Sequence, residues 1–219
     1  MARVRERSYS GGMFRFALAL LLTLPLSALA VDAGPLIQKI EARYSDVGVI
    51  EAQFVQKTAS SLYGDDVQKG SVTLKRPLKM RWDFGDRQLV MNGQTLWIYT
   101  LADKQVLEFD TSKGPIDPMY SLLGSLDNLG ALFEVVVVES GDTGYVLDLT
   151  PKGQAEFKKI RLSLNGELVL EKVAVTNPMG DPVELSFSDV KLEKDANDEQ
   201  FDFVAPEGVE TIKPAEMGF

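Results

Sequence analysis

The sequence predicts a mainly β protein: a single curved antiparallel sheet that forms an incomplete, half-open barrel covered by a few short helices. Apolar and polar residues alternate along most of the chain from about residue 49 to residue 192, which is the period of half-buried strands. Turn signals rich in Gly, Asn and Asp separate these segments at short intervals. With 219 residues, 45% of them hydrophobic, the chain is long enough for one domain with a sizeable core.

The first thirty residues have the features of a cleaved signal peptide. Four arginines, at positions 3, 5, 7 and 15, precede an uncharged run over residues 16–29. Ala28, Leu29 and Ala30 provide the pattern of small residues that signal peptidase reads. The run is shorter than the roughly 20 apolar residues of a transmembrane helix. We therefore expect residues 1–30 to be a signal peptide and residues 31–219 to be one exported domain.

The composition excludes several classes of function. A net charge of −9 without a basic patch disfavours nucleic acid and anionic lipid surfaces as partners. The absence of His and Cys removes the usual neutral-pH base, thiol nucleophiles, disulfides and tetrahedral zinc sites. Nucleophile elbows and Gly-rich phosphate loops are also missing. We expect no metal and no cofactor.

Carboxylate pairs are the one catalytic device present in quantity. Glycoside hydrolysis would need two carboxylates about 5–10 Å apart in a cleft. The available acids lie on turns or polar strand faces, where solvated surface acids are the favoured interpretation, so we predict that the protein is not an enzyme. The acids considered are Asp65, Asp66, Asp83, Asp103 and Asp110.

The elements follow in order. Pro35 begins a segment with apolar residues three and four apart, which predicts a helix that ends near Gly48. The period then changes to two, and three groups of side chains share strand faces. These groups are Ile50, Ala52 and Phe54; Val72 and Leu74; and Met80, Trp82 and Phe84.

Turns connect these strands. Asn92-Gly93 and Asn165-Gly166 predict two-residue hairpin turns in which both central residues have positive φ. Further turns are expected at residues 85–86, 102–104, 141–144 and 178–182. The apolar period slips at Ser188-Asp189, which predicts a β-bulge that helps the sheet to curve.

One helical segment interrupts the strands. Asp117 as the N-cap and Pro118 as the first helical residue begin it, and Gly124 and Asn128 are expected to divide it into two short helices. Its apolar residues recur at helical spacing up to Phe133. They are Met119, Leu122, Leu123, Leu126, Leu129 and Leu132.

Binding of an apolar ligand is the function that these features favour. An open, curved sheet encloses a concave face lined by alternate residues of each strand, and helices over its mouth keep water out. Ordinary packing of the sheet against helices explains the same residues equally well, and periodicity alone leaves both interpretations open. The lining candidates are Phe54, Leu74, Met80, Trp82, Phe84, Leu96 and Ile98.

Short motifs spread over most of residues 31–219 carry a family resemblance. They are Phe54-Val55-Gln56, Gly70, Leu74-Lys75-Arg76-Pro77, Arg81-Trp82, residues 88–99, Gln105-Val106, Phe201-Asp202-Phe203 and residues 206–209. In this order they resemble the periplasmic outer-membrane lipoprotein carrier family (LolA). Asn92 departs from the pattern, where Asp is more typical, but both residues suit the same turn.

The resemblance implies a fold and a function. The fold is an incomplete barrel of about eleven antiparallel strands lidded by helices. The function is that of a periplasmic chaperone, a monomer that shields the acyl chains of lipoproteins and carries them from the inner to the outer membrane. An ATP-driven inner-membrane lipoprotein-releasing complex would load it, and an outer-membrane lipoprotein receptor would empty it. The missing cysteine fits the carrier, because that receptor needs a lipidated cysteine.

The resemblance also implies a lid latch at Arg76, whose guanidinium would donate hydrogen bonds to carbonyls of the covering helix. A solvated arginine at a strand end is the alternative. We hypothesise that residues 118–133 form the lid, with Met119, Leu122, Leu123 and Leu126 as the residues of its helices.

Other functions stay open. A related half-barrel that binds another lipid or glycolipid, or acts as a periplasmic sensor, would keep the cavity and change the ligand. The strand pattern and the terminal Phe219 also suit an outer-membrane barrel, but Pro206 and Pro214 would break the last strand of such a barrel.

Overall fold

The computed structural model describes residues 32–59, 64–113, 122, 124–153, 157, 159–176 and 182–213. Residues from Val31 to Phe219 form one compact unit. The predicted signal peptide, residues 1–30, lies outside the described residues.

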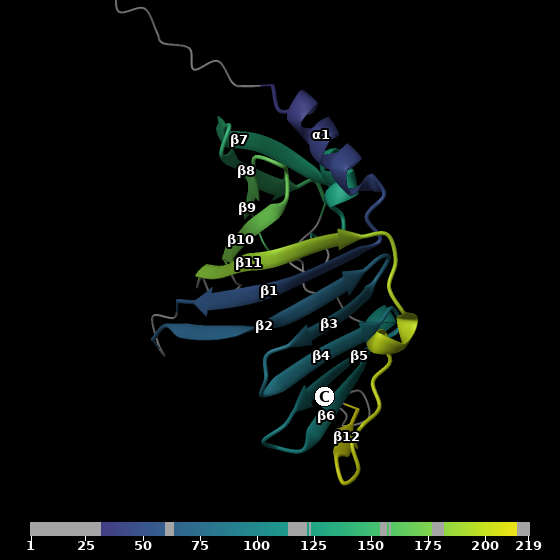
Figure 1. Cartoon of the computed structure of the whole chain (residues 1–219). Helices are drawn as coiled ribbons and strands as arrows, with labels where there is room; N and C mark the ends of the chain where they lie inside the picture. Colours follow the sequence, from purple (N-terminus) through teal and green to yellow (C-terminus); the bar gives the residue numbers. More distant parts are fainter. Residues whose placement is uncertain are drawn as a thin grey trace, which may run out of the picture. The chain divides into compact units, whose positions relative to one another are not determined.

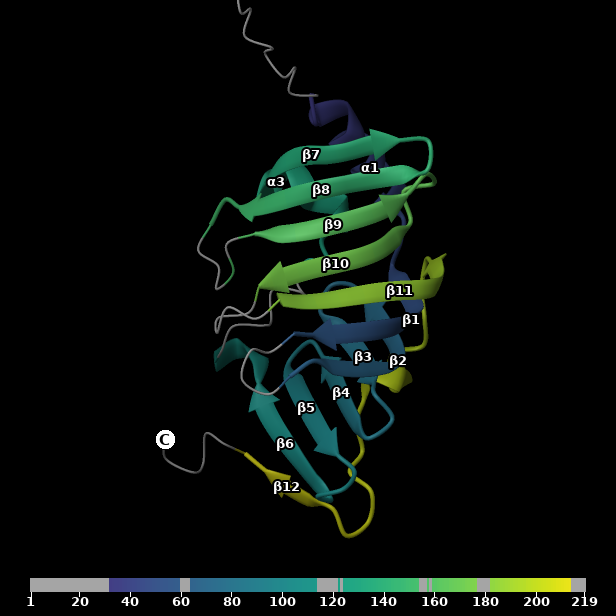
Figure 2. The ribbon, with the colours of Figure 1, turned by 90° about the vertical axis from the view of Figure 1, so that its left-hand side faces the viewer.

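One curved, open sheet forms the body of this unit, which confirms the predicted mainly β class (Figure 1). In the described residues it has twelve strands in the spatial order β12-β6-β5-β4-β3-β2-β1-β11-β10-β9-β8-β7, so that β12 and β7 form its two edges (Figure 2). The strands are β1 (Val49–Thr58), β2 (Asp66–Lys75), β3 (Lys79–Asp83), β4 (Arg87–Asn92), β5 (Thr95–Thr100), β6 (Gln105–Asp110), β7 (Phe133–Gly141), β8 (Gly144–Pro151), β9 (Ile160–Asn165), β10 (Leu170–Thr176), β11 (Pro182–Glu193) and β12 (Glu210–Ile212).

The sheet is mixed, which corrects the expectation of a purely antiparallel one. The neighbouring strands pair antiparallel, except that β12 runs parallel to β6, with Glu210 opposite Gln105. This strand was not predicted. Three residues that follow Pro206 and Gly208 are too few to show a strand period.

The helices are short and lie mainly on one side of the sheet. The predicted first helix is confirmed as α1 (Gly34–Ser45), with Pro35 in its first turn. The 3₁₀ helix η2 (Leu126–Asn128) ends at Asn128, which is also the N-cap of α3 (Leu129–Leu132), so the expected division at this residue is present. Asp117 and Pro118 lie outside the described residues. The other 3₁₀ helices are η1 (Thr111–Lys113) and η3 (Asp198–Phe201). Among the described residues, each helix is too short or too polar to span a bilayer.

Both Asn-Gly hairpins form, but by a different turn chemistry from the predicted one. At the β4–β5 turn Gly93 has a φ of 98°, while Asn92 stays in the ordinary region and its side chain accepts from the N–H groups of Gln94 and Thr95. In the β9–β10 loop the Asn165 side chain accepts from the N–H groups of Glu167 and Val169. The asparagines therefore act through side-chain capping of the turn rather than through positive φ.

The predicted bulge between β11 and β1 is confirmed. Gln53 pairs with Ser188 and Glu51 with Lys191, so β11 holds one extra residue between these pairs, and Asp189 has a φ of 51°. A bulge bends its strand and increases the local twist. It lies in the middle of the sheet, where the curvature allows the two halves to face a common core.

The main core lies against the inner face, which we define as the face of the sheet that packs against α1, η2 and α3. The predicted strand faces are confirmed here, since Ile50, Ala52, Phe54, Val72 and Leu74 are all buried. A second, smaller apolar region lies on the opposite, outer face. There the C-terminal segment, residues 195–213, packs against β3 and β4 through η3 and against β5 through Phe203.

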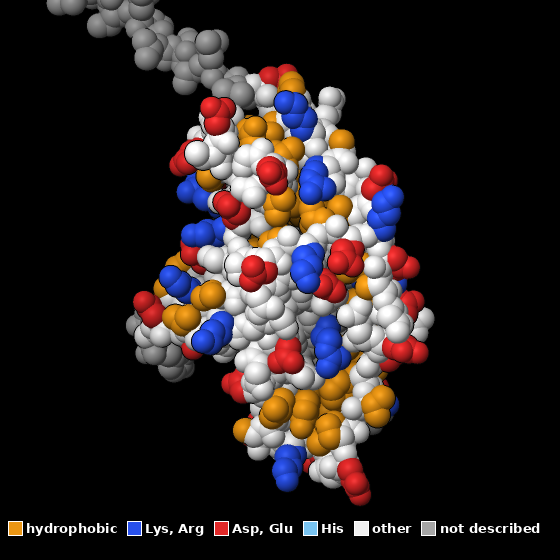
Figure 3. Space-filling model, viewed as in Figure 1, with side chains coloured by type: hydrophobic (Ala, Val, Ile, Leu, Met, Phe, Trp, Pro, Cys, Tyr) orange, Lys and Arg blue, Asp and Glu red, His pale blue; other side chains and the backbone are white. Residues whose placement is uncertain are grey.

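The apolar region on the outer face consists of both buried and half-buried side chains. Val90, Val106 and Phe201 are fully buried without being part of the inner cluster. The ring of Phe203 lies 6.2 Å from that of Trp97 and 5.8 Å from that of Tyr99. Apolar side chains also gather on the surface in the part of the view over β5, β6 and β12 (Figure 3).

Candidate functional site

The structure brings all seven predicted lining residues into one apolar cluster on the inner face. Phe54, Met80 and Trp82 are almost fully buried, and Leu74 is 7% exposed. Phe84, Leu96 and Ile98 are partly buried and pack against the same cluster. The curved sheet therefore aligns alternate residues of β1 to β5 along one wall.

Aromatic rings form the centre of this wall. The rings of Phe54 and Trp82 meet edge to face with centroids 4.8 Å apart, and Phe54 meets Phe84 in the same way at 4.9 Å. The guanidinium of Arg87, in β4, lies 4.5 Å from the centre of the Phe84 ring, over its face. Such contacts hold large apolar side chains in defined positions.

The half of the sheet formed by β7 to β11 supplies the opposite wall, which sequence reasoning missed. Its inward side chains are almost fully buried and belong to the same cluster. The alternation at residues 160–164 was visible, but nothing in a strand pattern says that two distant strands face each other across a bend. These side chains are Leu147, Leu149, Ile160, Leu162, Leu164, Leu170, Val173 and Leu185.

Helical segments fill the space between the walls. Leu122, Leu126 and Leu129 are at most 1% exposed and pack within the inner cluster. We call residues 122 and 124–132, which include η2 and α3, the cover segment. Of the four predicted lid residues, Leu122 and Leu126 therefore face the core, while Met119 and Leu123 lie outside the described residues.

Helix α1 is a second element over the inner face. Ile40 and Tyr44 are its buried side chains. The Tyr44 hydroxyl accepts a hydrogen bond of 3.0 Å from the Leu170 N–H, and burial raises the pKa of this hydroxyl above its usual value. It is therefore neutral at physiological pH, and α1 is tied to the start of β10.

A small cavity remains between these elements. It has a volume of about 100 Å³ and is lined by apolar side chains that include Ile50, Leu74, Met80 and Leu126, with Arg76 at its rim. Ligand pockets usually measure about 300–1,000 Å³. The protein's own side chains therefore occupy most of the space between α1, the cover segment and the sheet. A wider and more open hollow of about 620 Å³ is lined by Phe54 and Phe84.

Arg76 lies where the sheet, α1 and the cover segment meet. It follows β2, and its guanidinium donates hydrogen bonds to the carbonyls of Tyr44 (2.8 Å), Ser45 (3.3 Å) and Val47, and forms an ion pair with Asp127 in η2. The carbonyls thus belong to α1 and the turn after it, whereas Arg76 reaches the predicted lid through a carboxylate. Helix C-termini leave carbonyls without partners, which explains why an arginine binds there.

Further polar contacts attach the cover segment. The Gly130 N–H donates to the Glu41 side chain of α1 at 2.8 Å, and the Lys152 ammonium donates to the Gly130 carbonyl at 2.6 Å. A side chain at position 130 would approach Ile37 and Glu41 within about 3.3 Å, so glycine allows α3 to lie close to α1. Asp127, Glu41 and Lys152 are functional candidates that no sequence pattern identified.

The site contains little that could perform chemistry. Within the described residues no group of three or more Asp and Glu side chains is arranged to hold a metal ion. The polar groups at the site bind backbone or each other around an apolar interior. Such an arrangement suits the enclosure of apolar groups.

Comparison with known proteins agrees with this geometry. Residues 45–204 match the family model described as outer membrane lipoprotein carrier protein LolA. The chain is similar to proteins named outer-membrane lipoprotein carrier protein from Azotobacter vinelandii (30% identical, covering 92% of this chain and 99% of the relative) and from Chromohalobacter salexigens (31%, covering 91% and 97%).

Among solved structures, an uncharacterized conserved protein from Thermus thermophilus has a similar fold, with a TM-score of 0.52 at 11% identity, covering 83% of this chain and 98% of that one.

Proposed function

The chain belongs to the LolA family of outer-membrane lipoprotein carrier proteins, and we propose that it shelters the acyl chains of a lipoprotein between the two walls of its sheet after the cover segment has moved out. Cargo is then a lipoprotein whose polypeptide stays in water while its acyl chains occupy the inner space. The carrier makes and breaks no covalent bond.

The observation that carries this proposal is the burial of Leu122, Leu126 and Leu129 among the lining side chains. They occupy the inner space with apolar groups that belong to helical segments rather than to the sheet. If these leucines moved out and nothing replaced them, the apolar lining would be exposed to water and would promote aggregation. The cover segment therefore acts as an internal substitute for cargo.

The energy of acyl-chain burial explains why the cover segment needs polar contacts that hold it closed. Burying a methylene group is worth ~0.8 kcal/mol, so three acyl chains taken from water would gain on the order of tens of kcal/mol, beyond the range of non-covalent affinities. Transfer must run from one apolar environment to another with a small net change. The polar contacts of Arg76 with α1 and Asp127 then set how readily the carrier opens and how strongly it expels cargo on closing.

The setting of this cycle is the periplasm, after removal of residues 1–30 as a signal peptide. We propose that an ATP-driven lipoprotein-releasing complex in the inner membrane loads the carrier, and that a lipoprotein receptor anchored in the outer membrane receives the cargo. The chain has no cysteine for a lipid anchor of its own.

A two-protein transfer assay tests the latch, with donor carrier loaded with an acylated lipoprotein and a receptor as acceptor. Arg76→Leu removes charge-assisted hydrogen bonds worth about 1.5–3 kcal/mol each, so we expect delivery to slow by at least about tenfold because closing no longer expels cargo. Arg81→Leu is the matched control, since Arg81 contacts Gln200 and Gln88 instead of the cover segment. Equal delivery by wild type and both variants would remove the latch from the mechanism.

The nature of the ligand is tested separately. Mass spectrometry of material that co-purifies with the chain from the periplasm should detect acylated protein. A free glycolipid in its place would favour a related half-barrel carrier or sensor and would contradict the lipoprotein proposal.

A further inference from the structure

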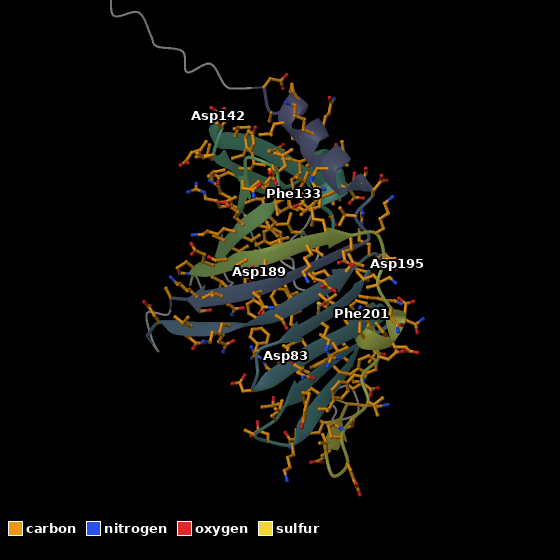
Figure 4. The ribbon with its side chains drawn as sticks, in the orientation of Figure 1. Asp83, Phe133, Asp142, Asp189, Asp195 and Phe201 are labelled. Carbon is orange, nitrogen blue, oxygen red and sulfur yellow. The ribbon has the colours of Figure 1, made fainter. Side chains whose placement is uncertain are left out.

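Strand β7 forms one edge of the sheet and has a partner, β8, on one side only. Within the described residues, no strand lies beyond it (Figure 2). Figure 4 labels Phe133, where the strand begins, and Asp142, in the turn that follows it. The outer row of backbone N–H and C=O groups is therefore a template for another strand.

The valines of β7 favour strand pairing along the first part of this edge. Residues 135–138 are four consecutive valines, of which Val136 is 62% and Val138 45% exposed, while Val135 and Val137 pack against the inner cluster. Natural edges are usually protected by lysine, proline or a bulge. Here a register shift falls between Val137 and Glu139, so the segment from Phe133 to Val137 stays regular.

Charge distinguishes between the possible occupants. Exposed glutamates flank the valines at both ends, as Glu134 and Glu139. If a second copy paired with residues 134–139 over their full length, antiparallel pairing would place Glu134 opposite Glu139, and parallel pairing would place each glutamate opposite itself. Like charges opposite one another destabilise strand pairs. The edge thus disfavours its own copy and favours a strand with basic ends.

We propose that the edge of β7 is a docking site for an extended polypeptide segment of another protein, a short β-branched or apolar run flanked by lysine or arginine, which adds a strand to the sheet. Backbone hydrogen bonds supply the affinity of such strand addition, and alternate side chains supply its specificity. The partner's apolar residues lie beside Val136, and its basic residues lie beside the two glutamates.

The position of this edge connects docking to the inner space. Helix α3 ends at Leu132 and β7 begins at Phe133, with no residue between them. Phe133 is itself part of the inner cluster. A strand that fixes the start of β7 therefore lies next to the attachment of the cover segment, although the docking itself does not depend on the proposed cargo.

The experiment uses the purified chain and a fluorescein-labelled synthetic peptide in which valine and threonine alternate between two lysines at each end. We expect saturable binding by fluorescence anisotropy, and slower hydrogen exchange of β7 amides when the peptide is added. Val136→Lys should weaken binding by about tenfold or more, because it places a positive charge at the centre of the edge, and the peptide is itself positively charged. The same change at Val55, an exposed position on the interior strand β1, should leave binding unchanged.

Two altered peptides and a second variant separate the outcomes. A peptide with alternate amides N-methylated keeps its charge but cannot pair, and equal binding of this peptide would overturn strand addition. Glu134→Lys should weaken binding of the lysine-flanked peptide and strengthen binding of a glutamate-flanked one. This tests the role of charge even if Val136→Lys does not fold. A dimer in sedimentation that Val136→Lys dissociates would instead assign the edge to a second copy and overturn the proposal.

Discussion

The cover segment on the inner face and the C-terminal segment on the outer face of the same sheet are attached in different ways. The described part of the cover segment includes a three-residue 3₁₀ helix and a four-residue α-helix, and it makes no strand pairing in the described residues. The C-terminal segment joins the sheet through β12 and through ion pairs of Lys75 with Asp195 and Asp198. Its buried anchor, Phe201, lies beside the ends of β3 and β4 (Figure 4).

This difference supports the proposal that the cover segment can move while the C-terminal segment stays in place. Helices this short have little stability of their own, because nucleation is costly and few internal hydrogen bonds form. The cover segment therefore depends on its buried leucines and on the contacts of Arg76, Glu41 and Lys152. In the proposed function the acyl chains of cargo take the place of these leucines. Acyl chains have no backbone, so they could not replace the strand pairing of the C-terminal segment.

The largest expected effect tests the structural role of the C-terminal segment. Phe201→Ala removes a fully buried ring, so we expect the free energy of unfolding to fall by about 3–5 kcal/mol. Urea-induced unfolding measures this, with Phe203→Ala as the control, because Phe203 is only half-buried. A loss below about 1 kcal/mol for Phe201→Ala would mean that the segment is as loosely held as the cover.

A smaller effect tests the inner face. Asp127→Asn weakens the ion pair with Arg76, whose side chains are 32% and 26% exposed, so we expect a local loss of about 1 kcal/mol or less. Hydrogen exchange of amides in α3 should then become up to about fivefold faster, while urea unfolding of the whole domain stays unchanged.

Asp103→Asn, in the exposed β5–β6 turn, is the matched control for this change. If Asp127→Asn lowered global stability as much as Phe201→Ala, the cover segment would be an integral part of the core and the contrast between the two faces would disappear.

The sequence predicted the wall of the site better than its closure. Alternation placed Phe54, Trp82 and Ile98 on one face, because a strand has only two faces and the apolar one must be buried. It also located the bulge at Asp189 and the first helix. These are local consequences of period, and no tertiary contact is needed to see them.

The missed features depend on contacts between distant residues. Asp127 is one acid among many in the sequence, and its role follows only from the position of Arg76, 51 residues earlier. The parallel strand β12 has no local signal, and the turn chemistry at Asn92 and Asn165 depends on loop length, which a dipeptide does not determine. A sequence can therefore predict which side chains face inward, and helical spacing can indicate a covering segment, but the contacts that hold this segment in place depend on residues far apart in the chain.

The smallest expected effect concerns pH and the ion pairs that hold the C-terminal segment. Hydrogen bonds from Lys75 and then Lys79 lower the pKa of Asp198 from 3.8 to about 2. A carboxyl whose pKa is lower in the folded state stabilises that state fully above its unfolded pKa, and loses this contribution as pH falls toward the folded value. We therefore expect stability to decrease between about pH 4 and pH 2, and the decrease to be shallower in Asp198→Asn.

Asp148 titrates in the same window and must be separated from Asp198. Hydrogen bonding from Arg161, and then from Lys159, lowers its pKa to about 2 as well. This cluster lies on β8 and β9, far along the sheet order from the C-terminal segment, so the effects of Asp148→Asn and Asp198→Asn should add. Hydrogen exchange during acid titration distinguishes them: loss of Asp198 should expose amides of β12 first, and loss of Asp148 those of β8. If β12 stayed protected in Asp198→Asn at every pH, strand pairing and Phe201 alone would hold the outer segment, and its ion pairs would contribute nothing to the contrast between the two faces.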